Sequence, residues 1–455
     1  MLLQTLLRPV ANVALGWYYK SVVVAHADRI PRDGPIFVAV NHPNALIDAL
    51  VVGIAVPRPV MFTAKATIFA NPFVAAFLRN AGVVPLRRAA DDRAATQSSP
   101  IDPARNATTF GAVADALERG NAVVIFPEGR SHDEPAMAPL RTGLARMALM
   151  ARDERNVRGI RIVPVGILFE RKEEPRSRVL LQVGEPIDVD RCATGPGAVA
   201  LLTETVSQRL AAVTLNFESA DDAARISRAA ESLSALIAPH GTIDDTGPTL
   251  RETLSVVRRT DRVNRALRER GDSVLVERAA RAEARLVRFR ERLQHTGVHA
   301  EDLGIDVGTG AGARFVVRES IRAAVMLPFS LWGRMTHFVP VRLARILAVR
   351  SSRSREDPAM HTLVIGFLLV LATYAIQIAI VAMLGGPWWA VGFAVTLIPS
   401  ASSDFRYGDR TRRLRLRAHT WRAFRRDPGL RLELMTEAEW LRSEAGAIER
   451  AVAGA

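Results

Sequence analysis

The sequence has a single cysteine, Cys192, in 455 residues, so no disulfide can form within the chain. It has no cysteine and histidine spacing typical of a zinc site, no internal repeat and no long low-complexity tract. His295 and His299 lie near two acidic residues, but we interpret them as exposed residues at a helix end rather than as metal ligands. We therefore expect neither a disulfide scaffold, nor a metal site, nor a repeat architecture.

Acidic residues are too few to balance the basic ones. Lys and Arg number 61 against 47 Asp and Glu, which gives a formal net charge of +14. Such an excess favours a polyanionic partner: nucleic acid, anionic lipid headgroups or phosphorylated substrates. The Arg-rich segment 404–455 carries neither an aromatic stacking pattern nor a DNA-binding motif, and it follows an apolar segment. We therefore expect a phospholipid membrane, and no nucleic acid, as its partner.

Charge is absent altogether from Leu363 to Leu384, a segment long enough to cross about 30 Å of hydrocarbon. The next stretch, "GGPWWAVGFAVTLIPSASS", is also uncharged but less hydrophobic. Arginines flank the pair on both sides, at 342, 345, 350, 353 and 355 before it and at 406, 410, 412, 413, 415 and 417 after it. Because arginines stay on the cytoplasmic side, we expect a transmembrane hairpin over residues 361–403, turning near Gly385 and Gly386. A single span or a buried core helix is the alternative.

The N-terminal stretch "MLLQTLLRPVANVALGWYY" is apolar but is interrupted by Arg8 and Pro9, and it lacks the pattern of a signal peptide. We predict an interfacial membrane helix over residues 1–24, with Trp17, Tyr18 and Tyr19 at the level of the lipid headgroups.

Residues 25–217 alternate short β-rich runs with helical patterns. The runs are "IFVAV", "PVMFTA", "GVVPL", "AVVIF", "IRIVPVGILF" and "RVLLQVG". This alternation predicts an α/β domain whose sheet is flanked by helices on both faces. Residues 218–305 have helical spacing and predict a helical insert. Residues 306–360 begin with a glycine-rich stretch, interpreted as a linker, and continue as a membrane-apposed connector.

Polar residues gather where the predicted strands end. His42 and Asp48 follow the run "IFVAV" and flank the start of a helix that Pro43 can open. A carboxylate that accepts a hydrogen bond from Nδ1 would leave Nε2 to take a proton from an alcohol. The alternative is a helix cap and a surface aspartate.

Further charged residues follow the neighbouring runs, and in an open α/β sheet ligands bind beyond the carboxyl ends of the strands. Arginine there suits a phosphate group. Lys65 is a candidate ligand for a substrate phosphate or for the phosphates of CoA, with a solvated lysine as the alternative. The other candidates are Arg87 and Arg88 in "GVVPLRR" and Glu128, Gly129, Arg130 and Ser131 in "FPEGRSHD".

The order "NHPNALID", "GVVPLRR", "FPEGRSHD", "PLRTGLARMAL", "IVPVGI" resembles the acyltransferase blocks of the glycerolipid acyltransferases, the glycerol-3-phosphate and lysophosphatidate acyltransferases. The resemblance implies an α/β acyltransferase domain with a mixed sheet. It also implies that His42 is the general base and Asp48 its orienting carboxylate. Arg88, Glu128 and Gly129 match acceptor-site positions, and Pro164 matches a position that shapes the acyl-donor side.

Two departures refine the resemblance. Five residues separate His42 from Asp48 where the commonest block has four, and "FPEGRSHD" places Arg130 one position early. Both features resemble the subgroup of yeast-type glycerol-3-phosphate acyltransferases. The resemblance implies transfer from acyl-CoA or acyl-carrier protein to glycerol-3-phosphate at the cytoplasmic face of a membrane, with no cofactor. A lysophospholipid acyltransferase is the enzymatic alternative, and a non-catalytic lipid-binding or scaffold protein is the other.

Overall fold

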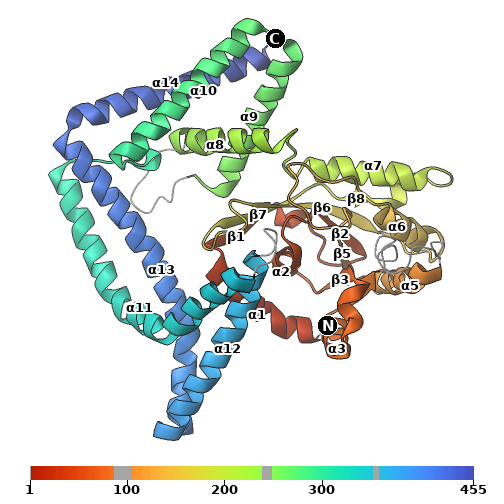
Figure 1. Ribbon diagram of the computed structural model, residues 1–455. Coiled ribbons are helices and arrows are strands. Elements are labelled where there is room, and N and C mark those ends of the chain that lie inside the picture. Colours follow the sequence, from red (N-terminus) through yellow and green to blue (C-terminus); the bar gives the residue numbers. More distant parts are fainter. Residues whose placement is uncertain (1, 87–103, 238–247, 352–357, 455) are drawn as a thin grey trace. The chain divides into compact units, whose positions relative to one another are not determined.

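The computed structural model describes residues 2–86, 104–237, 248–351 and 358–454 (Figure 1). The chain forms two compact units. The first, here called the sheet unit, comprises Met1–Asn216 and Ala348–Val364. The second, the helical unit, comprises Phe217–Leu347 and Ile365–Ala455.

The sheet unit is built on one mixed sheet in the order β1-β7-β6-β2-β5-β3-β4, with the short β8 beside β6. Strands β6, β2, β5, β3 and β4 are mutually parallel, and β7 and β8 run antiparallel to β6. The strands are β1 (Ser21–Ala25), β2 (Ile36–Val40), β3 (Val60–Lys65), β4 (Val83–Leu86), β5 (Ala122–Ile125), β6 (Arg161–Phe169), β7 (Arg178–Val183) and β8 (Ile187–Asp188).

Helices cover both faces of this sheet, which explains why every residue of β2 is buried. Phe37 and Ala39 face a core shared with α5, α6 and α7, whereas Ile36, Val38 and Val40 face a core shared with α1 and α2. The helices are α1 (Leu2–Tyr18), α2 (Ala45–Ala55), α3 (Pro72–Asn80), α5 (Ala104–Glu118), α6 (Gly143–Asp153) and α7 (Ala198–Ala211). The α/β prediction is confirmed, and all six predicted runs form strands.

The N-terminal segment differs from its prediction. Residues 21–25 form β1, which pairs with β7. Leu15, Tyr18 and Tyr19 are buried in the core of the sheet unit, with Tyr19 fully inaccessible. The placement of Tyr18 and Tyr19 at the headgroup level is therefore wrong. Their rings fill space under the sheet, and Arg8 donates to the carbonyls of Ile54 and Val56 at the end of α2, which ties α1 to the domain.

The helical unit contains seven helices among its described residues. Leu236, Phe289, Phe424 and Leu434 lie in its core. The described parts of residues 218–305 are mostly helical, and the helical insert stays a prediction. The glycine-rich stretch is mostly not a linker, because a long helix begins at Thr309. The helices are α8 (Ala220–Ile237), α9 (Leu250–Arg270), α10 (Ser273–Thr296), α11 (Thr309–Ser351), α12 (Pro358–Gly385), α13 (Pro387–Arg426) and α14 (Pro428–Ala453).

The C-terminal segment is an integral part of this unit and not a separate tail. Arg278 pairs with Glu444 at 2.8 Å and Arg285 with Glu437 at 2.6 Å, which joins α10 to α14. Arg417 is one of the arginines that follow the apolar segments. It forms a 2.8 Å ion pair with the buried Asp302, in the segment that joins α10 to α11. The basic character of residues 404–455 is therefore partly neutralised inside the fold.

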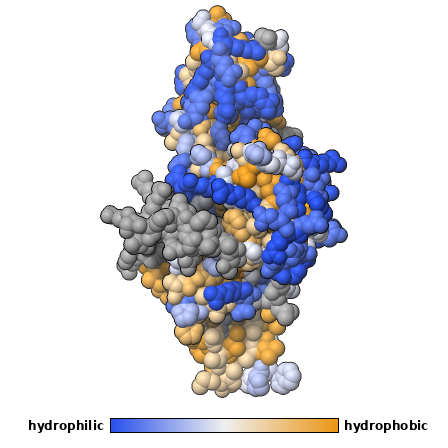
Figure 2. All heavy atoms as spheres, turned by 90° about the vertical axis from the view of Figure 1, so that its right-hand side faces the viewer, coloured by the Kyte–Doolittle hydropathy of each residue, from blue (hydrophilic) through white to orange (hydrophobic). Residues whose placement is uncertain are grey.

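Helix α12 contains the one described segment, Leu363–Gly385, that is long and apolar enough to span a membrane. The helix ends at Gly385, and α13 begins at Pro387 after Gly386, so the break lies where the hairpin turn was predicted. The first part of α13 exposes Trp388 and Trp389. The apolar surface where the two helices meet is visible at the lower end of Figure 2.

Candidate active site

Three of the predicted site residues lie at the ends of neighbouring strands, on one edge of the sheet. Because β2, β3, β4 and β5 are parallel, their carboxyl ends lie on the same side. His42 follows β2, Lys65 ends β3, and Glu128 follows β5. Arg87 and Arg88 directly follow β4 in the sequence but lie outside the described residues.

His42 and Asp48 form the central pair of this edge. The imidazole Nδ1 lies 2.9 Å from the Asp48 Oδ2, and the backbone N–H of Asn44 donates to the same oxygen at 2.7 Å. The Asp48 side chain is fully buried, whereas that of His42 is 15% exposed. A carboxylate in this position holds the tautomer with the proton on Nδ1 and leaves Nε2 able to accept one. Among the described residues, Nε2 has no hydrogen-bond partner.

Burial raises the pKa of the Asp48 carboxyl above its usual range. The hydrogen bonds from His42 and Asn44, together with the positive charge of Lys172, act in the opposite direction. The neighbours that stabilise the charged carboxylate are thus the base itself and the loop that carries it.

The segment after β5 holds the His42 segment in place. The backbone N–H of His42 donates to Glu128 Oε1 at 3.0 Å, and the backbone N–H of Ala45 donates to Ser131 Oγ at 3.1 Å. The N–H of His132 donates back to the His42 carbonyl at 3.3 Å. The ring of His42 also stacks on Phe126, with 4.0 Å between centroids. Position and orientation of the imidazole are therefore set from both ends.

The Glu128 carboxylate makes several of these contacts. Besides His42, its carboxylate accepts from the backbone N–H of Ala138 at 2.8 Å and contacts the His132 Nε2. The residue is 3% exposed. Both carboxylate oxygens are thus engaged within the protein, and we interpret Glu128 as a residue that positions the base.

The remaining predicted residues of this segment lie at the rim. Gly129 adopts a left-handed conformation, φ +75°, where a side chain is unfavourable, and its N–H donates to the Phe126 carbonyl. Arg130 is exposed and pairs with Glu134 at 2.6 Å. The turn at Gly129 therefore directs the chain from β5 toward Ser131, while Arg130 remains at the surface.

Pro164 lies inside β6, opposite Ala39 of β2, and is buried. Its missing N–H falls between the pairings of β6 with β8 and with β7, and its carbonyl accepts from Gly184 at 2.8 Å. Its ring lies close to Gly184, where an added Cβ would come within 2.9 Å of the ring. The predicted contact of Pro164 with the acyl donor stays a prediction.

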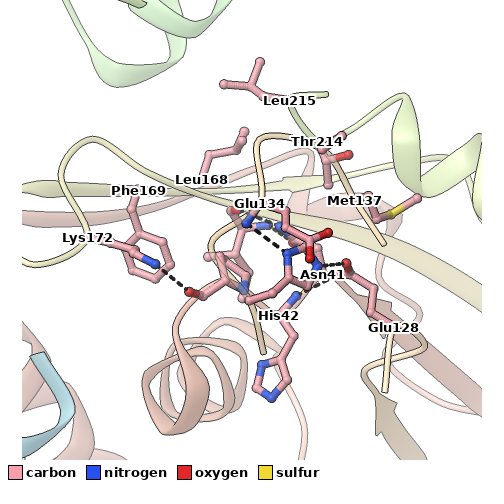
Figure 3. Close-up of a pocket in the computed structure, with 14 residues that line it drawn as sticks. Asn41, His42, Glu128, Glu134, Met137, Leu168, Phe169, Lys172, Thr214 and Leu215 are labelled. Carbon is pink, nitrogen blue, oxygen red and sulfur yellow. Dashed lines mark hydrogen bonds and ion pairs between the residues drawn. The ribbon is translucent and has the colours of Figure 1, made fainter. Parts of the chain in front are cut away.

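A pocket of about 200 Å³ borders the His42 segment. Its walls include Glu128, His132, Met137, Phe169 and Lys172. Figure 3 shows the imidazole of His42 extending away from the other labelled residues, so the pocket lies beside the segment that carries the base.

Lys172, Phe126 and Asn44 belong to the site but were not predicted. Lys172 contacts the Pro43 carbonyl at 3.3 Å and Asp133 at 2.6 Å. It lies in the loop after β6, the strand next to β2, and this neighbourhood is the signal that could have identified it. Phe126 directly precedes "PEG", and Asn44 lies within "NHPNALID". Pairing of strands far apart in sequence brings these residues together.

Within the residues that the structure describes, no group of three His, Cys, Asp or Glu side chains could hold a metal ion. The two histidines considered above, His295 and His299, are both exposed. The acidic neighbour Asp302 is buried against Arg417 at 2.8 Å and so serves the helical core.

Comparison with known proteins matches residues 21–168 to the family model described as Acyltransferase. The chain is 42% identical over 85 residues to glycerol-3-phosphate O-acyltransferase 2 of Saccharomyces cerevisiae, covering 19% of this chain and 11% of that protein. It is 34% identical over 111 residues to glycerol-3-phosphate O-acyltransferase 1 of the same yeast, covering 23% and 15%. The matches thus span well under a fifth of these two relatives.

Among solved structures, the 1-acyl-sn-glycerophosphate acyltransferase PlsC of Thermotoga maritima matches with a TM-score of 0.36 and 20% identity, over 46% of this chain and 78% of that one. The family model covers the segment that carries His42, Asp48 and Glu128. Residues 21–168 are thus identified as an acyltransferase domain, and the chain is similar in part to two yeast glycerol-3-phosphate O-acyltransferases.

Proposed function

We propose that the protein transfers a fatty acyl group from acyl-CoA or acyl-carrier protein to the sn-1 hydroxyl of glycerol-3-phosphate, giving lysophosphatidate for phospholipid synthesis. The observation that carries the proposal is the 2.9 Å contact between His42 and the buried Asp48 at the carboxyl edge of the sheet. The partial likeness of the chain to two glycerol-3-phosphate O-acyltransferases of yeast supports the choice of acceptor.

The proposed reaction uses His42 as a general base. Nε2 takes the proton of the primary hydroxyl as its oxygen attacks the thioester carbonyl, and Asp48 stabilises the imidazolium that forms. The tetrahedral intermediate then collapses, the C–S bond breaks, and the thiolate leaves as the ester forms. Every step uses side chains and substrates alone, so we propose that no cofactor takes part.

The proposed phosphate site lies at the outer end of the same edge. Strand β4 is the third strand from β2, through β5 and β3. Neighbouring strands are about 4.8 Å apart, so the end of β4 at Leu86 is roughly 14 Å from β2. The acceptor and the long arginine side chains together can bridge such a distance. Lys65, at the end of the intervening β3, is the proposed second contact for a phosphate.

An acceptor panel tests the proposed function. Purified full-length protein would be given labelled acyl-CoA with glycerol-3-phosphate, dihydroxyacetone phosphate, lysophosphatidate or lysophosphatidylcholine, each offered alone. We expect glycerol-3-phosphate to give the highest kcat/KM. A higher value with either lysophospholipid would replace the proposal by the alternative acyltransferase, and no transfer to any acceptor would favour a non-catalytic lipid-binding protein.

Substitution of Arg88 by Ala should raise the KM for glycerol-3-phosphate about tenfold or more, because a paired, charge-assisted contact with the phosphate is lost. The KM for acyl-CoA should change little. The matched control is Arg130→Ala, which removes an exposed arginine already paired with a glutamate. A defect confined to the KM for acyl-CoA would mean that the two substrate sites are exchanged.

We propose that α12 and α13 form a membrane hairpin with the sheet unit on the cytoplasmic face. Helices α10 and α14 pack together through ion pairs and a shared core, so they must lie on the same side of the membrane. The chain between them therefore crosses an even number of times. Since α12 has the properties of a span, one further crossing is required, and α13 is the helix that follows the turn at Gly386.

Thiol labelling tests this topology in a variant with Cys192 replaced by Ser. Single cysteines would replace Ser273 at the start of α10, Gly386 at the turn and Ser443 on α14, and intact cells would be treated with an impermeant reagent. We expect labelling of G386C alone, and of S273C and S443C only after permeabilisation. Labelling of S443C without S273C in intact cells would establish a single span.

A further inference from the structure

The helical unit contains a second cavity, of about 350 Å³, between α8, α9, α10 and α14. This volume lies within the range of ligand pockets, which often form between the helices of a bundle. Its walls are mainly apolar and include Ile226, Leu233, Val263, Leu286 and Leu441. The core of the unit leaves this space unfilled although buried leucines adjoin it.

The charged residues of the cavity leave one positive charge without a carboxylate. Arg225 pairs with Glu283 at 3.0 Å, and Arg259 pairs with Glu449. Arg442 donates to the carbonyl of Leu236 at 2.6 Å, and in the described part of the chain it has no carboxylate partner. A backbone carbonyl satisfies one donor of a guanidinium but does not neutralise its charge, so an anion can still bind there.

An apolar interior beside one arginine that has no carboxylate partner among the described residues matches an amphiphile that has one hydrocarbon chain and one anionic head. We propose that this cavity binds a single-chain anionic lipid, with its chain among α8, α9, α10 and α14 and its head at Arg442. The inference rests on the proposed function in one respect, because the proposed reaction uses and makes lipids of this kind. The site is separate from the pocket beside His42, since the two share no lining residue.

Photo-crosslinking to the full-length protein in nanodiscs tests the proposal. The probe is palmitate with a diazirine in its chain, and the crosslinked peptides are identified by mass spectrometry. We expect peptides of α9, α10 and α14 to be labelled, and an excess of palmitate or hexadecyl phosphate to compete. The stronger competitor shows whether the natural head is a carboxylate or a phosphate. Equal competition by neutral hexadecanol, or labelling restricted to other segments, would overturn the proposal.

Two matched pairs of variants locate the site. Ala445→Phe fills the cavity and should abolish the competed labelling, whereas Ser443→Phe, on the exposed face of the same helix, should leave it unchanged. Arg442→Gln should weaken competition by hexadecyl phosphate about tenfold, and Arg228→Gln, exposed on α8, should not. Circular dichroism checks that each variant is folded, and equal labelling within both pairs would contradict the assignment.

The proposed transferase activity and this inference can fail separately. His42→Ala should keep the competed labelling in full, because the base lies in the other unit. An active enzyme whose α9, α10 and α14 are not labelled would leave the reaction intact and remove the lipid site. Labelling in a protein that acylates no acceptor would keep the lipid site and remove the proposed reaction.

Discussion

Replacing His42 by Ala is expected to lower kcat for acyl transfer by about 10²–10⁴-fold, the usual cost of losing a general base. The fold should persist, because the imidazole is partly exposed at the carboxyl edge of the sheet and makes its main contacts with Phe126 and Asp48. Steady-state kinetics with acyl-CoA and glycerol-3-phosphate measure the effect, and thermal unfolding measures the fold. Turnover within tenfold of the unmodified protein would refute the mechanism.

His42 and Asp48 should act as a unit in catalysis. Asp48→Asn keeps the size of the side chain but removes the charge that holds Nδ1 protonated, so kcat should again fall by about 10²-fold or more. The double variant should be no slower than the slower single variant, because the two residues act on one proton transfer. His295→Ala, an exposed histidine of the helical unit, serves as the control and should be fully active. Multiplicative losses in the double variant would show independent roles.

Replacing Glu128 by Ala should lower both the stability of the protein and its turnover. The change leaves the backbone N–H groups of His42 and Ala138 without their acceptor in a buried place, and removes the partner of His132. We expect the free energy of unfolding to fall by about 1–3 kcal/mol. Because the His42 segment loses one of its attachments, kcat should fall by about 10²-fold while both KM values change little.

Two variants separate this positioning role from contact with the substrate. Glu128→Gln retains one acceptor oxygen and should recover part of both the stability and the turnover. Glu134→Ala removes an exposed carboxylate that also lines the pocket, and should alter neither. A Glu128→Ala variant whose main defect was a raised KM for glycerol-3-phosphate, at unchanged stability, would instead place this carboxylate on the acceptor.

Much of the sheet could be predicted because its strands are buried on both faces and therefore read as uninterrupted apolar runs. The exceptions have physical causes. The strand β1 follows the aromatic end of α1 in the sequence, so its apolar residues continue the pattern that predicts a membrane helix. Tyr18 and Tyr19 illustrate the same ambiguity, since an amphipathic aromatic suits either a headgroup layer or a core beside polar groups.

At the site, the sequence predicted the contact between His42 and Asp48 but not the hydrogen bonds that hold the His42 segment in place. The position of His42 and Asp48 within seven residues made their contact predictable, because it depends on one loop and one helix turn. The hydrogen bonds from His42 to Glu128 and from Ala45 to Ser131 join residues 86 positions apart. Such pairings follow from the order of strands β2 and β5 in the sheet, which no local pattern encodes.

The packing of α14 on α10 has a consequence for the order of events during synthesis. The ion pair between Arg278 and Glu444 joins residues 166 positions apart, and α14 is made after α12 and α13. Until α14 emerges from the ribosome, the part of α10 that packs on it stays uncovered, and such an apolar surface binds chaperones or aggregates. The helical unit can therefore finish folding only after α12 and α13 have been translated. A premature stop before residue 428 would thus leave a chain with its sheet complete and its bundle open, a natural target for degradation.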